Sequence, residues 1–268
     1  MTSGIDPEAN FAVIENAIKK AAEGGAEVLF TPEMSLLLDR DRKRARDWIE
    51  SNAPDEFVQR CRLLATDCGI DIALGSVPVA SGTGKWANRS YYFNRDHDQP
   101  THYDKIHMFD VELATGETWR ESSAYEAGDK PVAVPDTPIG TLGLAICYDM
   151  RFPSLFHALG RAECSAIAVP SAFTVPTGKA HWHTLLRARA IEASAFVIAV
   201  AQVGKHEDGR ETYGHSLVVD PWGEVLLDMG GDAPGLGFCD IDLERINEVR
   251  AQVPSLANRR EIPNCKVG

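Results

Sequence analysis

Short apolar runs alternate with segments of helical periodicity along almost the entire chain, and this alternation limits the fold more than any other feature. Apolar residues recur at helical spacing between residues 8 and 23, which predicts an amphipathic helix that the Gly24-Gly25 pair ends. The run from Val28 to Phe30 then predicts a buried strand. Elements that alternate in this way are typical of an α/β fold.

The alternation continues to the carboxyl end of the chain. Strands are expected over residues 71–79, 86–94, 143–146, 165–169, 195–202, 214–219, 224–227 and 235–240, and helices over residues 55–67, 153–159 and 180–193. Several consecutive strands near the carboxyl end predict two sheets that are faced by helices. No repeat, low-complexity tract or linker divides the sequence, so we expect one domain over residues 1–268.

The balance of charge restricts the class of partner. With 39 acidic and 27 basic side chains, the chain has a formal net charge of -12, whereas nucleic-acid binding depends on basic patches. The acidic surface gives no reason to expect membrane attachment, and no apolar stretch is long enough to span a bilayer. We therefore expect a protein that binds neither nucleic acid nor membranes and acts on a small molecule.

The six cysteines follow no CxxC spacing and no regular framework, which indicates reduced thiols and a cytoplasmic location. Cys61, Cys164 and Cys239 lie in apolar or helical stretches and are interpreted as core residues. Metal binding is not expected. His181 and His183 are two residues apart, which directs them to different faces of a helix, and no second ligand pair follows at a spacing typical of zinc sites.

Cys147 is the residue that most strongly suggests an enzyme. It follows the apolar run from Gly143 to Ile146, and Pro153 opens the helix beyond it. A thiol at a strand-to-helix turn occupies the place where open α/β sheets hold their chemistry, and neighbouring backbone N–H groups can stabilise an oxyanion there. A buried structural thiol is the alternative, since free cysteines are usually buried.

Two charged residues at other strand ends favour the nucleophile. Glu33 follows the first predicted strand, and Lys105 follows an extended segment that ends near Tyr103. Either charge alone is also explained as a solvated group at the end of a strand. Together with Cys147, they supply a base, an oxyanion stabiliser and a nucleophile, which is the complete set for acyl transfer.

In these three residues the chain resembles the nitrilase superfamily of carbon–nitrogen hydrolases, whose Glu–Lys–Cys triad corresponds to Glu33, Lys105 and Cys147. The resemblance extends from about residue 5 to residue 260. Within it, the segment RESSAYEAGD is similar to the loop that carries a second active-site glutamate, here Glu121. The resemblance implies a four-layer α-β-β-α sandwich, an amidase that needs no cofactor, and a homodimer in which helices pack on helices.

Two longer segments resemble the Nit group within this superfamily, namely PSAFTVPTGKAHWHTLLRARAIE and YGHSLVVDPWGEVL. The most similar branch hydrolyses deaminated glutathione. The segment from Ser171 to Thr174 favours that branch over the ω-amidases, which act on 2-oxoglutaramate and typically have Gly-Ala-Phe-Asn there. An ω-amidase, another small-amide or N-carbamoyl hydrolase, and a non-catalytic binding scaffold stay open as alternatives.

The mechanism that these residues suggest gives each of them one task. Glu33 takes the proton of Cys147, because a thiol with an ordinary pKa of about 8.5 is mostly protonated at neutral pH. Lys105 and the backbone N–H of Tyr148 hold the oxyanion. After a thioester has formed on Cys147, Glu33 and Glu121 position the water that hydrolyses it.

An anionic substrate has to enter against the negative net charge, so groups that anchor carboxylates are expected near the nucleophile. The candidates are Arg151, Thr174 and Lys179. The charged run DRDRKRARDWIE is interpreted instead as a solvated helix entrance.

Both ends of the chain have features that the domain alone does not explain. Relatives begin with an apolar strand, whereas this chain begins at Met1 inside the loop that should follow, so we expect a longer natural polypeptide that supplies the strand. The polar tail from Val253 to Gly268 contains prolines and several charged residues. It is expected either to become ordered on a partner subunit or to fray.

Overall fold

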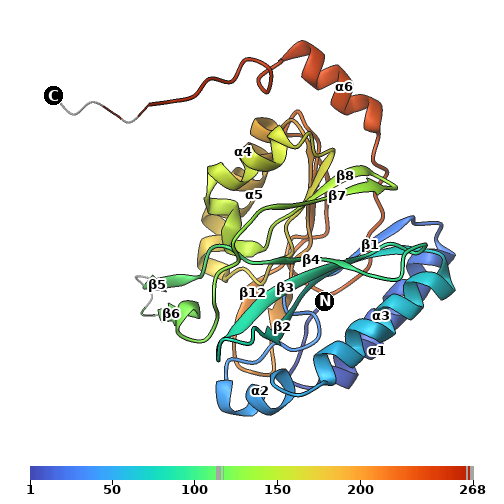
Figure 1. The fold of residues 1–268 in the computed structure, drawn as a ribbon, viewed down its shortest axis with the longest axis vertical. Coiled ribbons are helices and arrows are strands. Elements are labelled where there is room, and N and C mark those ends of the chain that lie inside the picture. The colour runs from blue at the N-terminus through green and yellow to red at the C-terminus, as the bar shows by residue number, and fades with distance from the viewer. Residues whose placement is uncertain (113–115, 117, 264, 266–268) are drawn as a thin grey trace.

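Two β-sheets pack face to face, and each is covered on its outer side by helices (Figure 1). The computed structural model describes residues 1–112, 116, 118–263 and 265. Helices α1 (Pro7–Glu23) and α3 (Ala53–Cys68) cover one sheet, and helices α4 (Pro153–Arg161) and α5 (Val175–Ala193) cover the other. The predicted four-layer α-β-β-α sandwich is therefore confirmed.

The first sheet has four strands in the order β1 (Val28–Phe30), β2 (Asp71–Ala80), β3 (Trp86–Phe93) and β4 (Thr101–Asp104). β1 runs parallel to β2, and the remaining neighbours are antiparallel. The sheet packs on apolar side chains that recur at helical spacing in α1 and α3, including Phe11, Ile14, Ile18, Phe57 and Cys61.

The second sheet has six strands in the order β14 (Val225–Asp228), β13 (Leu217–Val219), β10 (Phe196–Ala199), β9 (Ala166–Ala168), β8 (Gly140–Leu144) and β7 (Val132–Thr137). β8, β9 and β10 are parallel, because α4 and α5 connect them as crossover helices. The core between this sheet and its helices includes the fully buried side chains of Trp182, Phe156 and Phe196.

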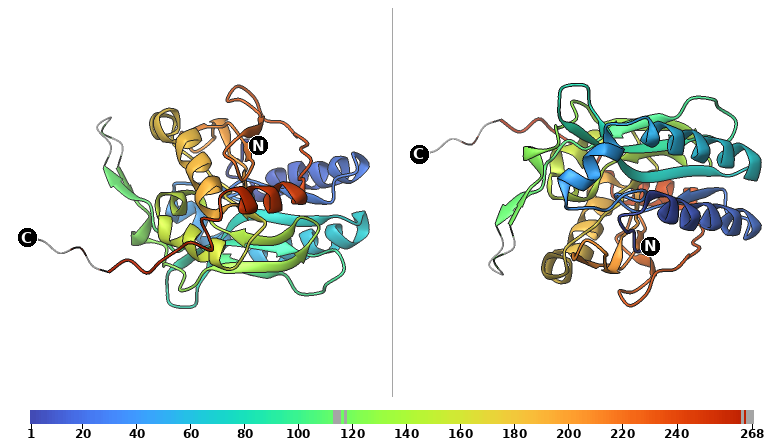
Figure 2. Two further views of the ribbon diagram at one scale, coloured as in Figure 1. Left: turned by 90° about the horizontal axis from the view of Figure 1, so that it is seen from above. Right: turned by 90° about the horizontal axis from the view of Figure 1, so that it is seen from below.

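The remaining elements lie at the ends of the sandwich. They are α2 (Arg42–Ile49), the hairpins β5 (Asp110–Glu112) with β6 (Thr118–Arg120) and β11 (Val203–Lys205) with β12 (Glu211–Tyr213), the 3-10 turns η1 (Glu121–Ser123) and η2 (Cys147–Arg151), and α6 (Leu243–Gln252). Beyond α6 the chain passes α4, where the Arg259 guanidinium donates to the carbonyl of His157 at 2.9 Å, and then leaves the body of the molecule (Figure 2). None of the described helices is long and apolar enough to cross a membrane.

The long helix α5 begins earlier than the sequence predicts. It starts at Val175 rather than near residue 180, with a proline in its first turn. Proline fits there because the first helical N–H groups have no partner within the helix. The sequence did not predict the first turn of α5, because the apolar periodicity of the helix becomes clear only after that turn.

The prediction of a strand over residues 235–240 is wrong, since this segment has no strand structure. A strand needs a neighbour that exchanges backbone hydrogen bonds with it. Here residues 235–240 and β1 both line a cavity of about 700 Å³. Within the described chain, β1 is an edge strand paired with β2 alone. Met1 also lines this cavity, and burial lowers the pKa of its amino group.

Candidate active site

Four side chains from separate elements meet where the two sheets adjoin. Glu33 and Lys105 follow strands β1 and β4 of the first sheet, Cys147 follows β8 of the second, and Glu121 begins η1. All four line one cavity of about 570 Å³. The structure thus brings together every acid, base and nucleophile that the sequence proposes for catalysis.

Lys105 lies at the centre of this cluster, with 2% of the residue exposed. Its Nζ atom lies 3.1 Å from Oε1 of Glu33 and 3.0 and 2.9 Å from the two carboxylate oxygens of Glu121. Burial lowers the pKa of Lys105, but the charges of Glu121 and Glu33 outweigh burial and raise this pKa well above its ordinary value. The side chain is therefore a fixed ammonium group beside the nucleophile.

Glu33 is held by two further donors. Its Oε1 accepts a hydrogen bond from Nδ2 of Asn88 at 2.9 Å, and its Oε2 accepts one from the N–H of Ala172 at 2.8 Å. The turn before Glu33 packs directly on β2, because a Cβ atom at Gly75 would lie 2.1 Å from the carbonyl oxygen of Thr31. Only glycine allows this close approach of two backbones.

Cys147 adopts a backbone conformation that is unusual for a residue with a side chain. Its φ angle is 46°, and its N–H donates to the carbonyl of Pro170 at 2.9 Å. Such strain persists only where the surrounding structure imposes it, and it is common at active sites. Burial and the charge of Glu33 raise the pKa of the thiol well above its ordinary value, against the opposing effect of Lys105. The resting residue is a neutral thiol that needs a base, and the Glu33 carboxylate lies close enough to raise the pKa of this thiol.

Asp149 fixes the turn that carries the nucleophile, and sequence reasoning missed it. This fully buried carboxylate accepts hydrogen bonds from the N–H of Ile146 at 2.9 Å and from the hydroxyl of Tyr103 at 2.7 Å. It also accepts from the N–H of His107 at 3.0 Å, and the Nδ1 atom of that histidine lies 2.7 Å away. Asp149 therefore links the end of β4, which directly precedes Lys105, to the turn that carries Cys147.

Asn88 on β3 connects the two glutamates. Its Nδ2 atom donates to Glu33 and, at 3.3 Å, to Oε1 of Glu121. Its carbonyl accepts a hydrogen bond from the N–H of Lys105 at 3.0 Å. The N–H of Phe109 donates to Oε2 of Glu121 at 2.6 Å and completes the support of that carboxylate. No sequence signal joins Asn88 to this site, because its partners come from other segments of the chain.

The candidates for binding and oxyanion stabilisation occupy different places. Tyr148 and Thr174 line the cavity. Arg151 and Lys179 are not among the described residues that line it. Arg151 instead lies over the rings of Tyr148 and Phe173 and within 3.3 Å of Nδ1 of His181, whereas Lys179 is exposed on α5.

Arginines from other segments also line the cavity, and Arg210 among them is paired with Asp208. Arg40, Arg42 and Arg210 line it together with Trp119. The guanidinium of Arg42 donates to neutral oxygen atoms of Ser123 and Arg120 at 2.6 and 2.7 Å, so these contacts leave its charge uncompensated. Two of these arginines belong to the run DRDRKRARDWIE, and the expectation of a merely solvated helix entrance was therefore incomplete.

The comparisons with known proteins agree with this geometry. The family model described as "Carbon-nitrogen hydrolase" matches residues 1–251, and the chain belongs to this family. The predicted membership of the nitrilase superfamily is thereby confirmed. The chain is 38% identical over 263 residues to a protein of Synechocystis named deaminated glutathione amidase, a match that covers 97% of this chain and 95% of the relative.

Solved structures show the same fold. The structure of the Caenorhabditis elegans NitFhit protein is similar with a TM-score of 0.84 and 37% identity, covering 97% of this chain and 63% of that one. An amidase from Nesterenkonia sp. AN1 is similar with a TM-score of 0.78 and 25% identity, covering 95% of each chain. In that structure acrylamide has undergone Michael addition at the active-site cysteine.

Proposed function

We propose that this protein is an amidase that cleaves the side-chain amide of deaminated glutathione to 2-oxoglutarate and cysteinylglycine. The observation that carries the proposal is the contact of Glu33, Lys105 and Glu121 beside Cys147 at a cavity lined by arginines. The 38% sequence identity to the Synechocystis protein named deaminated glutathione amidase supports the choice of substrate.

In the first half of the reaction, Glu33 removes the proton of the Cys147 thiol as the sulfur attacks the amide carbonyl carbon. The Lys105 ammonium and the backbone N–H of Tyr148 stabilise the oxyanion that forms, and a single donor of this kind is typically worth about 2.7–4 kcal/mol. The tetrahedral intermediate then expels cysteinylglycine, whose amine takes the proton held by Glu33. A thioester between Cys147 and the 2-oxoglutaryl group remains.

In the second half, water hydrolyses this thioester. Glu33 accepts a proton from the water, which attacks the thioester carbonyl, and Cys147 leaves as a thiolate that recovers the proton. Glu121 holds the Lys105 ammonium through both carboxylate oxygens, and thus keeps the oxyanion site in place during both halves.

The cavity arginines anchor the substrate in this proposal. Deaminated glutathione carries one carboxylate beside its 2-oxo group and another on the glycine of its leaving group. Arg42, whose contacts are neutral oxygens, pairs with one of these carboxylates, while Thr174 lines the same cavity as a hydroxyl donor. Charge-assisted hydrogen bonds are worth about 1.5–3 kcal/mol, which corresponds to roughly 10- to 100-fold in kcat/KM.

Steady-state kinetics on deaminated glutathione and 2-oxoglutaramate tests this assignment. We expect the higher kcat/KM for deaminated glutathione, and we expect Arg42→Met to lower that value by roughly 10- to 100-fold. Arg46→Met is the matched control, because Arg46 lies on the same helix and is not among the described lining residues. A tenfold preference for 2-oxoglutaramate would make the enzyme an ω-amidase instead.

We further propose that residues 1–268 act as one catalytic domain in the reducing cytoplasm and that the chain forms homodimers. The surface suited to a second copy combines the exposed side chains of Ile191 on α5 and of Trp222, Val225 and Leu226 on the turn between β13 and β14 and on β14. Ile191 lies close to Gly223 in that turn, and exposed apolar side chains that gather in this way are typical of protein interfaces. Sedimentation equilibrium of the wild type and of Trp222→Glu tests the dimer, which the charge should dissociate.

A further inference from the structure

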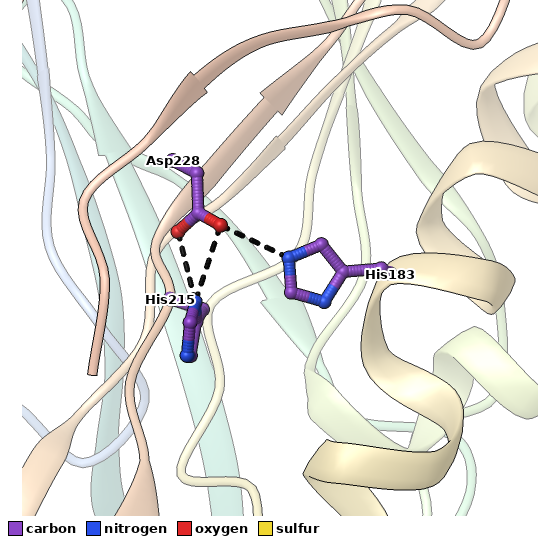
Figure 3. A group of neighbouring side chains, drawn as sticks. All are labelled: His183, His215 and Asp228. Carbon is purple, nitrogen blue, oxygen red and sulfur yellow. Dashed lines mark hydrogen bonds and ion pairs between the residues drawn. The ribbon is translucent and has the colours of Figure 1, made fainter.

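Two histidines and one aspartate meet on the surface outside the catalytic cavity (Figure 3). His183 lies on α5, His215 lies between β12 and β13, and Asp228 is the last residue of β14. The Nε2 atom of His183 lies 3.0 Å from Oδ2 of Asp228, and the Nδ1 atom of His215 lies 3.0 and 3.2 Å from its two oxygens. One potential ligand atom of each residue lies within 4.8 Å of the others.

The surrounding backbone and rings hold these side chains in place. The N–H of Gly230 donates to Oδ1 of Asp228 at 2.9 Å, and its carbonyl accepts the N–H of His215 at 2.7 Å. The ring of Tyr213 stacks on the ring of His215 with the centroids 4.4 Å apart. His215 has a φ angle of 57°, in the left-handed region, so its position depends on these neighbours. The cluster is therefore organised before any ligand arrives.

The spacing is that of two ordinary hydrogen bonds, and a small adjustment converts it to the spacing of ligands around a small cation. Zn²⁺ binds imidazole nitrogen and carboxylate oxygen at about 2.0–2.2 Å, which separates neighbouring ligand atoms in a tetrahedron by roughly 3.3–3.6 Å. The two histidine–aspartate separations of 3.0 Å need to grow by only a few tenths of an ångström. The side chains are 38%, 25% and 33% exposed for His183, His215 and Asp228, which leaves an open side for a cation and water.

We propose that His183, His215 and Asp228 form a zinc site with water as the fourth ligand. Two imidazoles and one carboxylate are typical ligands of zinc, whereas Mg²⁺ and Ca²⁺ prefer sets made of oxygen alone. The metal binds the lone pair of each histidine nitrogen that faces Asp228, and the single proton of each neutral ring then lies on its other nitrogen. The residues come from three segments separated by up to 45 positions in sequence, which is why no spacing motif predicts the site.

The site has a structural task in this proposal. Zinc would join α5 to the antiparallel strands β13 and β14, because the three ligands come from α5, from the segment before β13 and from the end of β14. The preceding residue on α5, Trp182, donates from its Nε1 to the carbonyl of His215 at 2.8 Å and packs on Phe173. Phe173 lines the catalytic cavity, so a fixed α5 also supports that wall.

Zinc titration of the full chain with Cys147→Ala tests the site. This substitution removes the thiol of the catalytic cavity as a competing ligand. We expect saturable binding of one Zn²⁺ per chain and a rise of the melting temperature with zinc. Adding His183→Gln or Asp228→Asn should weaken binding about tenfold or more, since loss of even an indirect support of a ligand costs roughly 10- to 100-fold.

Two controls keep the result interpretable. His157→Gln removes an exposed histidine on α4 and should leave zinc affinity unchanged. Co²⁺ distinguishes the ligands, because nitrogen and oxygen give weak visible bands only, whereas a cysteine thiolate adds intense charge-transfer absorption. Equal zinc affinity in the parent chain, His183→Gln and Asp228→Asn, or a thiolate spectrum, overturns the proposal. Unchanged melting temperatures of the metal-free variants show that they fold.

Discussion

The hydroxyl of Tyr103 donates to Oδ2 of Asp149 at 2.7 Å and thereby joins the strand before Lys105 to the turn of Cys147. Tyr103→Phe removes this bond while it keeps the ring. A typical hydrogen bond contributes about 0.5–1.5 kcal/mol to the free energy of unfolding. We expect a loss of at least this size, because the buried carboxylate of Asp149 also loses a donor. Because the bond sets the position of the nucleophile, kcat should fall while KM changes little. Steady-state kinetics with thermal unfolding separates the two effects, and Tyr125→Phe, which removes a hydroxyl from a residue lining the cavity, serves as the comparison.

Cys147→Ala should abolish turnover and leave the fold intact, because the sulfur is the group that bonds to the substrate. A thiol-reactive amide should label Cys147 in the wild type. Cys61 should resist the same reagent, because it lies fully buried in the core and burial raises the pKa of its thiol to about 12. Peptide mass spectrometry locates the adduct. Turnover that survives Cys147→Ala contradicts the assignment.

Glu33→Gln and Lys105→Arg should each lower kcat sharply. Glutamine keeps the shape of Glu33 but cannot accept the thiol proton, and arginine replaces a compact ammonium with a broad planar group in a buried space. Glu121→Gln should reduce kcat less, because it holds Lys105 and does not touch the thiol proton. Single-turnover kinetics gives the rates of thioester formation. A kcat near that of the wild type in either of the first two variants excludes the proposed roles.

Acid should weaken the fold through His206. Its Nδ1 atom lies 2.9 Å from the carbonyl of Ser3 and its Nε2 atom lies 2.8 Å from the hydroxyl of Thr212, and burial lowers its pKa below the ordinary 6.5. Below pH 6.5 the unfolded chain binds a proton there that the folded chain does not, so the free energy of unfolding falls as pH decreases. His206→Gln should flatten this dependence at pH values below about 6.5. Thermal unfolding across that range checks the slope, with His157→Gln expected to retain it.

The cavity beside β1 should accept an added strand. An apolar segment of roughly five to ten residues joined to the amino end of Met1 would exchange hydrogen bonds with the unpaired edge of β1 and fill part of the 700 Å³. It also removes a buried charge at Met1, whose amino group is partly desolvated. We expect a higher melting temperature and a greater soluble yield. A polar Gly/Ser segment of equal length is the control, and equal melting temperatures contradict the prediction.

Local pattern predicts helices α1, α3, α4 and α5 and the strand ends at which Glu33, Lys105 and Cys147 lie, because these features depend on a few neighbouring residues, but it misses β7 and α6. Glu121 came only from resemblance, since η1 has no apolar periodicity. Asp149 and Asn88 escaped prediction because each makes its decisive hydrogen bond, to Tyr103 and to Glu33 respectively, with a distant segment. The wrong strand over residues 235–240 has the same cause, because composition does not reveal whether a partner edge lies alongside.

The base Glu33 and the nucleophile Cys147 belong to different sheets, so the rate of catalysis depends on how accurately the two sheets are held against each other. A slip of about 1 Å between the sheets would part Glu33 from Cys147 and can cost roughly 100-fold in rate, although every strand and helix would persist. Mild heat or denaturant should therefore abolish the enzymatic activity before the far-UV circular dichroism signal of the helices and strands changes. Mutations in the core between the sheets, far from any substrate, then act as inactivating mutations without unfolding the chain.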